Sequence, residues 1–184
     1  MRTAVLDANV LYGAFARDVL LRLAAAGLYR PRWTARIEAE WTRALLDSRP
    51  DLSAQVARTR AAMARAFPDA AVEGHERHES AFSLPDPDDR HVLAAAIEAE
   101  AGEVVTWNLA DFPDDALRPF GVEALSPDAF VLSLVEADRA RVMTTLRRHR
   151  ARLARPTLTA SEYGGHLARA GLVATADALR EESL

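Results

Sequence analysis

The stretch LPDPDDRHVLAAAIEAEAGEVVTWNLADFP, residues 84–113, contains an acidic turn, an apolar helical pattern and a short β-like run in close succession. The segment from Asp89 to Ala101 is predicted to be a helix that ends at Gly102, because glycine commonly follows the last residue of a helix. Residues 104–106, Val-Val-Thr, then have the pattern of a short strand. A helix that leads directly into a short apolar strand is typical of a parallel α/β sheet.

The remaining sequence up to residue 130 shows the same alternation. Its first strand is Ala4–Leu6, a continuous apolar run of the kind that is buried on both faces of a parallel sheet. Further helices are predicted at 19–26, 35–46 and 52–67, further short strands at 71–72 and 122–125, and a short helix with a turn at 111–120. This spacing predicts a parallel, doubly wound α/β sheet.

From Pro127 onward the sequence pattern is helical throughout, with breaks predicted at Pro156 and at Gly164–Gly165. We therefore expect two parts. Residues 1–130 would form the α/β domain, and residues 131–184 would form an all-helical extension.

The composition is that of an ordinary globular protein, with 49% hydrophobic and 27% charged residues and a formal net charge of −4. No apolar run reaches the ~18 residues of a membrane span, and no secretory leader is visible, so we expect a cytoplasmic protein without membrane attachment. The chain contains neither cysteine nor lysine. This excludes thiolate catalysis, cysteine zinc sites and chemistry that depends on a lysine.

Polar side chains follow two of the predicted strands. Asp7 ends the first strand, Asn108 comes directly after residues 104–106, and Asp111 lies about one helical turn later. The active crevice of an open parallel sheet lies at the carboxyl ends of its strands. These residues are therefore candidates for a site at that edge.

The acidic turn at the start of the opening stretch supplies a further candidate. Asp89 lies at the inner edge of the helix face that carries Val92 and Leu93. Asp86 and Asp88 belong to a proline-containing turn and are predicted to cap it. The predicted helix at 35–46 offers two glutamates, Glu38 and Glu40, on opposite sides of its apolar stripe, and the helical wheel does not distinguish between them.

Four motifs in this order resemble those of PIN-domain nucleases, of the kind found as the VapC toxin of VapBC toxin–antitoxin pairs. They are LDANVLY (6–12), RWTARIEAEWTRALL (32–46), the opening stretch (84–113) and FGVEALSPDAF (120–130). The helical tail resembles the extension of one subgroup. The resemblance implies a three-layer α/β/α fold with a short parallel sheet.

The resemblance also implies a site for a divalent metal. Its acidic residues would be Asp7, Glu40, Asp89 and Asp111, supported by the polar residues Asn9, Thr106 and Asn108. Asp7 and Asp89 are expected to bind the metal directly, and Glu40 and Asp111 through water. Asn108 stands where many relatives carry aspartate, so the fourth carboxylate depends on whether Asp111 reaches the site.

The function implied by the resemblance is hydrolysis of RNA phosphodiester bonds with Mg²⁺ or Mn²⁺, by the toxin of a type II toxin–antitoxin pair. These hard cations prefer oxygen ligands and activate bound water. The expected partners are RNA, a cognate antitoxin and a second copy of the chain in a homodimer. The alternative is a PIN scaffold that binds RNA or protein without catalysis, although a cluster of unpaired carboxylates is destabilising unless it binds metal.

Other polar and aromatic residues allow more than one interpretation. Residues 139–156 hold seven arginines and a histidine. They would form a solvated helix face or, through Arg147, Arg148 and Arg150, a contact with RNA or a partner. His91 is interpreted as a surface group or a support for a ligand. The tryptophans Trp33, Trp41 and Trp107 are interpreted as core or pocket-wall residues.

A phosphatase of the haloacid dehalogenase type also begins with an aspartate at a strand end. It requires a second aspartate two positions later and a downstream lysine. Here the sequence is Asp7-Ala8-Asn9 and lysine is absent, which excludes this class.

Overall fold

The computed structural model describes residues 1–153 and 157–180, and its centre is a four-stranded parallel sheet. The strands are β1 (Thr3–Leu6), β2 (Arg30–Arg32), β3 (Glu103–Val105) and β4 (Glu123–Leu125), in the spatial order β2-β1-β3-β4. Val5 aligns with Val104 of β3, and Val104 aligns with Ala124 of β4. The predicted parallel α/β sheet is therefore confirmed.

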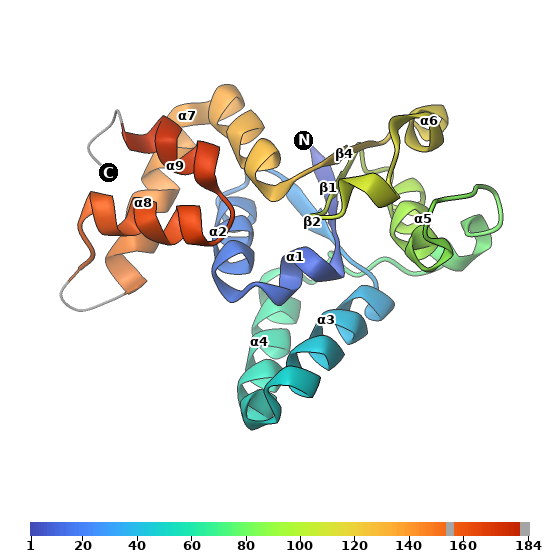
Figure 1. The fold of residues 1–184 in the computed structure, drawn as a ribbon, viewed down its shortest axis with the longest axis horizontal. Helices are drawn as coiled ribbons and strands as arrows, with labels where there is room; N and C mark the ends of the chain where they lie inside the picture. The colour runs from blue at the N-terminus through green and yellow to red at the C-terminus, as the bar shows by residue number, and fades with distance from the viewer. Residues whose placement is uncertain (154–156, 181–184) are drawn as a thin grey trace.

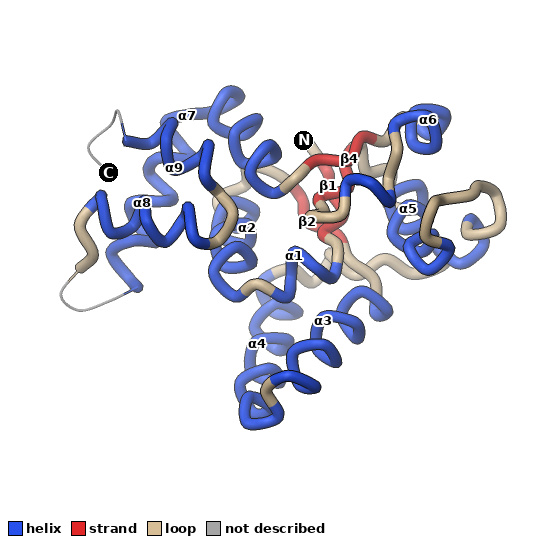
Figure 2. The backbone as a smooth tube through the Cα atoms, in the orientation of Figure 1, coloured by secondary structure: helices blue, strands red, loops and turns tan. Residues whose placement is uncertain are grey.

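Helices surround this sheet (Figures 1 and 2). They are α1 (Ala8–Tyr12), α2 (Ala14–Ala25), α3 (Ala35–Ser48), α4 (Ser53–Ala66), α5 (Arg90–Glu98), α6 (Asp114–Leu117), α7 (Pro127–Leu153), α8 (Ala160–Arg169) and α9 (Val173–Arg180). Short 3-10 turns are η1 (Pro50–Leu52), η2 (His75–His78), η3 (Pro87–Asp89), η4 (Leu109–Asp111) and η5 (Arg118–Phe120). In Figure 1, α2 and the start of α7 lie on one side of the sheet and α5 lies on the other, while α3 and α4 project from it as a pair.

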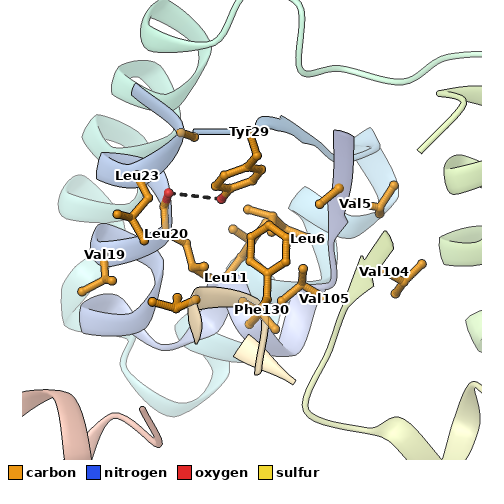
Figure 3. Packing of buried hydrophobic residues seen from close by; sticks show 14 of the residues in the cluster. Val5, Leu6, Leu11, Val19, Leu20, Leu23, Tyr29, Val104, Val105 and Phe130 are labelled. Atoms are coloured by element: carbon orange, nitrogen blue, oxygen red, sulfur yellow. Dashed lines mark hydrogen bonds between the residues drawn. The ribbon is translucent and has the colours of Figure 1, made fainter. Parts of the chain in front are cut away.

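The core lies between the sheet and α2 and is closed by the start of α7 (Figure 3). Tyr29 is fully buried, and its hydroxyl donates a hydrogen bond to the carbonyl of Leu20 at 3.1 Å. The ring of Phe130, in the first turns of α7, packs edge-on against Tyr29 with centroids 4.8 Å apart. The helical C-terminal part thus begins inside the same core.

Two predictions about strands were wrong. The strand β2 was missed, because Pro31 at its centre suggested the start of a helix. Proline is tolerated here because β2 lies at the edge of the sheet. The strand predicted at 71–72 is only an isolated parallel bridge between Trp33 and Ala71.

The break predicted at Gly164–Gly165 was also wrong, because α8 continues through both glycines. Glycine inside a helix costs about 1 kcal/mol relative to alanine. A capping box offsets this cost, since Thr159 and Glu162 satisfy each other's backbone N–H groups. The chain turns instead at Gly171, whose φ of +84° suits glycine. The break predicted at Pro156 falls outside the described residues.

Helix α7 consists of two helical segments, because Asp138 has non-helical dihedral angles (φ −152°, ψ 72°). The side chain of Asp138 restarts the helix by accepting a hydrogen bond from the backbone N–H of Arg141 at 3.0 Å. The division into residues 1–130 and 131–184 stays a prediction.

Two polar clusters attach the second half of α7, α8 and α9 to the rest of the molecule. His149 of α7 is buried between Asp18 of α2 (Nε2 to Oδ2, 2.9 Å) and Tyr163 of α8 (Nδ1 to hydroxyl, 2.8 Å). Asp128, at the start of α7, accepts hydrogen bonds from the backbone N–H groups of Ala174 and Thr175, each at 2.8 Å. In residues 1–153 and 157–180, no helix is long and apolar enough to cross a membrane.

Candidate active site

Asp7 is the most buried acid at the carboxyl end of the sheet, with 5% of its surface exposed. Its Oδ1 accepts the backbone N–H of Ala8 at 2.6 Å and so caps α1. Its Oδ2 accepts hydrogen bonds from the Thr106 hydroxyl and the Asn9 amide, both at 2.7 Å. Burial raises the pKa of Asp7, although the bonds from Thr106 and Ala8 oppose this effect. The structure thus places Asn9 and Thr106 directly against Asp7.

The same polar groups fix the loop that follows β3. The Asn9 side-chain oxygen accepts the backbone N–H of Trp107 at 3.1 Å, and the Thr106 hydroxyl accepts that of Asn108 at 3.1 Å. Asn108 therefore contributes a backbone group to this network. The ends of β1 and β3 are held together by side chains as well as by the sheet.

Asp89 directly precedes α5, close enough to Asp7 for their charges to interact. Its pKa is raised to about 6, first by burial and then by the negative charges of Asp7, Asp86 and Asp111. Asp111, in η4, is therefore near enough to act on Asp89 electrostatically. Asp86 caps its own turn, since its Oδ1 accepts the backbone N–H of Asp88 at 2.8 Å, as predicted.

Of the two glutamates on α3, Glu40 is the one that lies beside α5 and near Asp7. Its Oε1 lies 3.2 Å from Nε2 of His91 on α5, and its negative charge contributes to the raised pKa of Asp7. Glu38 instead pairs with Arg60 of α4 at 3.0 Å. The geometry therefore favours Glu40, where the helical wheel left both residues open.

Two partners of Glu40 were not predicted as site residues. His91 is only 1% exposed and contacts Glu40, so of its two interpretations the surface group is wrong and the support for a site residue is favoured. Arg36 lies 3.0 Å from Glu40 and donates a second hydrogen bond to the carbonyl of Asp88 at 3.1 Å. Burial opposes ionisation of Glu40, but the hydrogen bonds from His91 and Arg36 lower its pKa. The sequence signals were the (i, i+4) spacing of Arg36 and Glu40 and the closeness of His91 to Asp89.

The family model described as PIN domain matches residues 3–110, which is more than half of the chain. This range spans the sheet from β1 to β3 and includes Asp7, Glu40 and Asp89. The chain belongs to the PIN-domain family. Asp111 lies just beyond the matched residues.

The C-terminal part of this PIN-domain protein has a match of its own. Residues 127–181 match the family described as VapC50 C-terminal domain. The chain is also 54% identical over 48 residues to "Putative ribonuclease VapC50" of Mycobacterium tuberculosis (strain ATCC 25618 / H37Rv). That alignment covers 26% of this chain and 28% of the relative, so it spans only about a quarter of either protein. No solved structure matches the chain at a significant level.

The acids near Asp7 in this PIN domain suit a hard cation, because such ions prefer oxygen ligands. Among the described residues, no group of three or more His, Cys, Asp or Glu side chains is placed so that it could hold a metal ion by itself. Mg²⁺, however, is usually bound by one or two carboxylates and retains several waters. Burial is the main cause of the raised pKa of Asp89, and the negative charges of Asp7, Asp86 and Asp111 add to it; a bound cation would oppose both effects.

The arginines predicted to contact RNA or a partner lie on a different element from these acids. Arg147 and Arg148 are exposed and Arg150 is partly buried, all in the second half of α7. Figure 1 shows this end of α7 beside α8, on the opposite side of α2 from α5 and its acids.

Proposed function

We propose that this PIN-domain protein is a divalent-metal-dependent endoribonuclease and the toxin of a type II toxin–antitoxin pair. The observation that carries the proposal is the electrostatic coupling of acids from separate elements: Asp7 and Asp111 both act on the pKa of Asp89, which burial raises further, and Glu40 acts on that of Asp7. The match to the PIN family and the local identity to a protein named as a VapC50 ribonuclease support the same conclusion.

In the proposed mechanism, Asp7 and Asp89 would be the direct ligands of Mg²⁺ or Mn²⁺, and Glu40 and Asp111 would act through bound water. When bound, such an ion lowers the pKa of a coordinated water and neutralises charge that develops at the phosphorus. Asn9 and Thr106 orient the Asp7 carboxylate through their hydrogen bonds to Oδ2.

The partners of Glu40 have a related role in the proposal. His91 and Arg36 hold the Glu40 side chain from two directions and keep it ionised near neutral pH. An ionised Glu40 can orient a water by accepting its hydrogen bonds. These two residues are positioning residues, because they act through Glu40.

The proposed partners follow from the proposed activity. The substrate is RNA, the inhibitor is a cognate antitoxin, and the chain forms a homodimer in the cytoplasm. Arg147, Arg148 and Arg150 are proposed to contact the antitoxin or distant parts of the RNA, since they lie in the second half of α7 and not on the elements that carry the acids.

The proposed activity is tested by incubating a mixed RNA pool with wild type and Asp89→Asn, in the presence of Mg²⁺, Mn²⁺ or chelator. The expected result is metal-dependent cleavage by wild type that the variant lacks. Asp69→Asn is the matched control, because Asp69 is exposed at the end of α4 and should leave cleavage unchanged.

Two outcomes would contradict the proposal. Equal cleavage by wild type and Asp89→Asn would show that the nuclease is a contaminant or that the site lies elsewhere. RNA binding without cleavage in either metal would instead favour a PIN scaffold that binds RNA but does not cut it.

A further inference from the structure

Trp107 differs from the other two tryptophans of the chain. Trp33 and Trp41 are buried in the core, as predicted, whereas Trp107 is 38% exposed. Its backbone N–H donates to Asn9, and Asn9 in turn donates to Asp7. Two hydrogen bonds therefore connect the backbone of this exposed tryptophan to the central acid of the candidate site.

The side chain of Trp107 reaches the helical C-terminal part of the molecule. A Cβ atom added to Gly171, in the turn between α8 and α9, would lie only 2.6 Å from Cη2 of Trp107. Only glycine leaves room for the indole at this distance. The anchoring of α9 by Asp128 and of α8 by His149 holds this turn against the loop after β3.

Trp107 lines a pocket of about 440 Å³ between two parts of the chain. One wall is the junction of α1 and α2, with Phe15, and the other is the turn from α8 to α9, with Arg169 and Gly171. The lining is largely apolar, and Arg169 supplies a positive charge at its edge. Among the described residues, Arg169 forms no ion pair, so its guanidinium is available to a ligand.

We infer that this pocket is a nucleotide subsite for the RNA substrate, in which a base stacks on Trp107 and its phosphate pairs with Arg169. An aromatic face beside an unpaired cation is the combination by which proteins hold single-stranded nucleic acids. The subsite rests on the proposed nuclease function, and its tryptophan is connected to Asp7 through Asn9. The helical extension then forms one wall of the RNA-binding site.

The subsite is tested by equilibrium binding in chelator, so that no cleavage occurs. The probes are a short labelled single-stranded RNA of mixed sequence and a ribose-phosphate chain of the same length without bases. Trp107→Leu keeps the apolar volume but loses the aromatic face, and should weaken RNA binding about 5- to 100-fold while leaving the abasic probe unaffected. Trp107→Phe should restore most of the affinity for RNA.

Arg169→Gln should behave differently, because it removes a phosphate contact. It should weaken binding of both probes and reduce the slope of log affinity against log salt concentration by about one, the value expected for one phosphate contact. The matched controls are Phe120→Leu, an aromatic side chain with the same 38% exposure, and Arg58→Gln, an exposed arginine on α4. Neither control should change binding.

A second measurement needs no substitution. Trp33 and Trp41 are buried, so a ligand that binds at the surface can quench only the fluorescence of Trp107 in the wild-type protein. RNA should quench it and the abasic probe should not. The inference is overturned if Trp107→Leu binds RNA as wild type does, or if neither RNA binding nor quenching is seen. If wild type shows no metal-dependent cleavage but its Trp107 fluorescence is quenched by RNA and not by the abasic probe, the nuclease proposal is overturned and the subsite is supported.

Discussion

The pKa of Asp89 reflects both its burial and the negative charge of the neighbouring acids. Its pKa of about 6 lies above the usual 3.8, so the folded protein retains a proton that the unfolded chain has already lost. Between these two values stability must fall as the pH rises, because the folded state binds more protons. Above about pH 6 the destabilisation is complete, and a bound cation would relieve it.

We therefore expect Asp89→Asn to raise the melting temperature of the metal-free protein at pH 7 and to leave it unchanged near pH 3. Thermal unfolding of wild type, Asp89→Asn and the control Asp69→Asn across this pH range checks the prediction. If wild type and Asp89→Asn melt at the same temperature at pH 7, the ionised carboxylate of Asp89 does not destabilise the folded protein.

The choice between the two glutamates of α3 is a second prediction at this scale. Glu40→Gln should lower the rate of RNA cleavage about 10- to 100-fold, as substitutions of groups that support a metal site typically do. Glu38→Gln should be nearly silent, because Glu38 faces Arg60 on α4. The measurement is the single-turnover rate of RNA cleavage. A large loss of rate in Glu38→Gln together with a small loss in Glu40→Gln would reverse the assignment.

The sequence was most informative where a residue's role depends on its own strand. Asp7 was predicted from its position at a strand end, whereas Asn9 and Thr106 were predicted from the resemblance to PIN-domain nucleases, and hydrogen bonds join both to Asp7. The pairing of Glu40 with His91 was not predicted. This pairing depends on how α3 and α5 are placed relative to each other, which the apolar pattern of neither helix predicts.

At the scale of elements, helix periodicity was predicted well and interruptions were not. The helix α8 continues through two glycines because its capping box and buried side chains outweigh their propensity. The strand β2 contains a proline that only its position at the sheet edge makes acceptable. Both errors arose where neighbouring elements override a local preference.

The buried cluster of Asp18, His149 and Tyr163 yields a prediction about the docking of α7 and α8 on α2. Tyr163→Phe leaves Nδ1 of His149 buried without its partner, and should lower the free energy of unfolding by about 1–3 kcal/mol. Urea unfolding measures the change. Tyr12→Phe is the control, since its hydroxyl contacts Ser48 at the surface and should have little effect. Equal effects of the two substitutions would show that the cluster does not stabilise docking.

At the scale of the whole molecule, the fold class and the helical character of the C-terminal part were both predictable. The alternation of apolar strands and helices predicts a sheet covered by helices. The helices beyond Pro127 match a C-terminal family of their own. The contact between Trp107 and Gly171 was not predictable, because it results from how the extension packs on the core.

The extent of the core suggests where the chain can be shortened. Val131 and Leu134 lie beyond residue 130 but are buried in the common core, whereas Asp138 interrupts α7. A chain ending at residue 130 should therefore unfold at lower urea concentration than one ending at residue 138. Equal midpoints would show that residues 131–138 add nothing to the α/β domain.

The central claim is that the acids at the carboxyl end of the sheet form one metal site. The most direct measurement is isothermal titration calorimetry of Mn²⁺ into wild type and Asp89→Asn, with Asp69→Asn as the control. The account predicts one site in wild type and in Asp69→Asn that is lost or strongly weakened in Asp89→Asn. Equal affinity in all three proteins, or no binding to wild type, would contradict it.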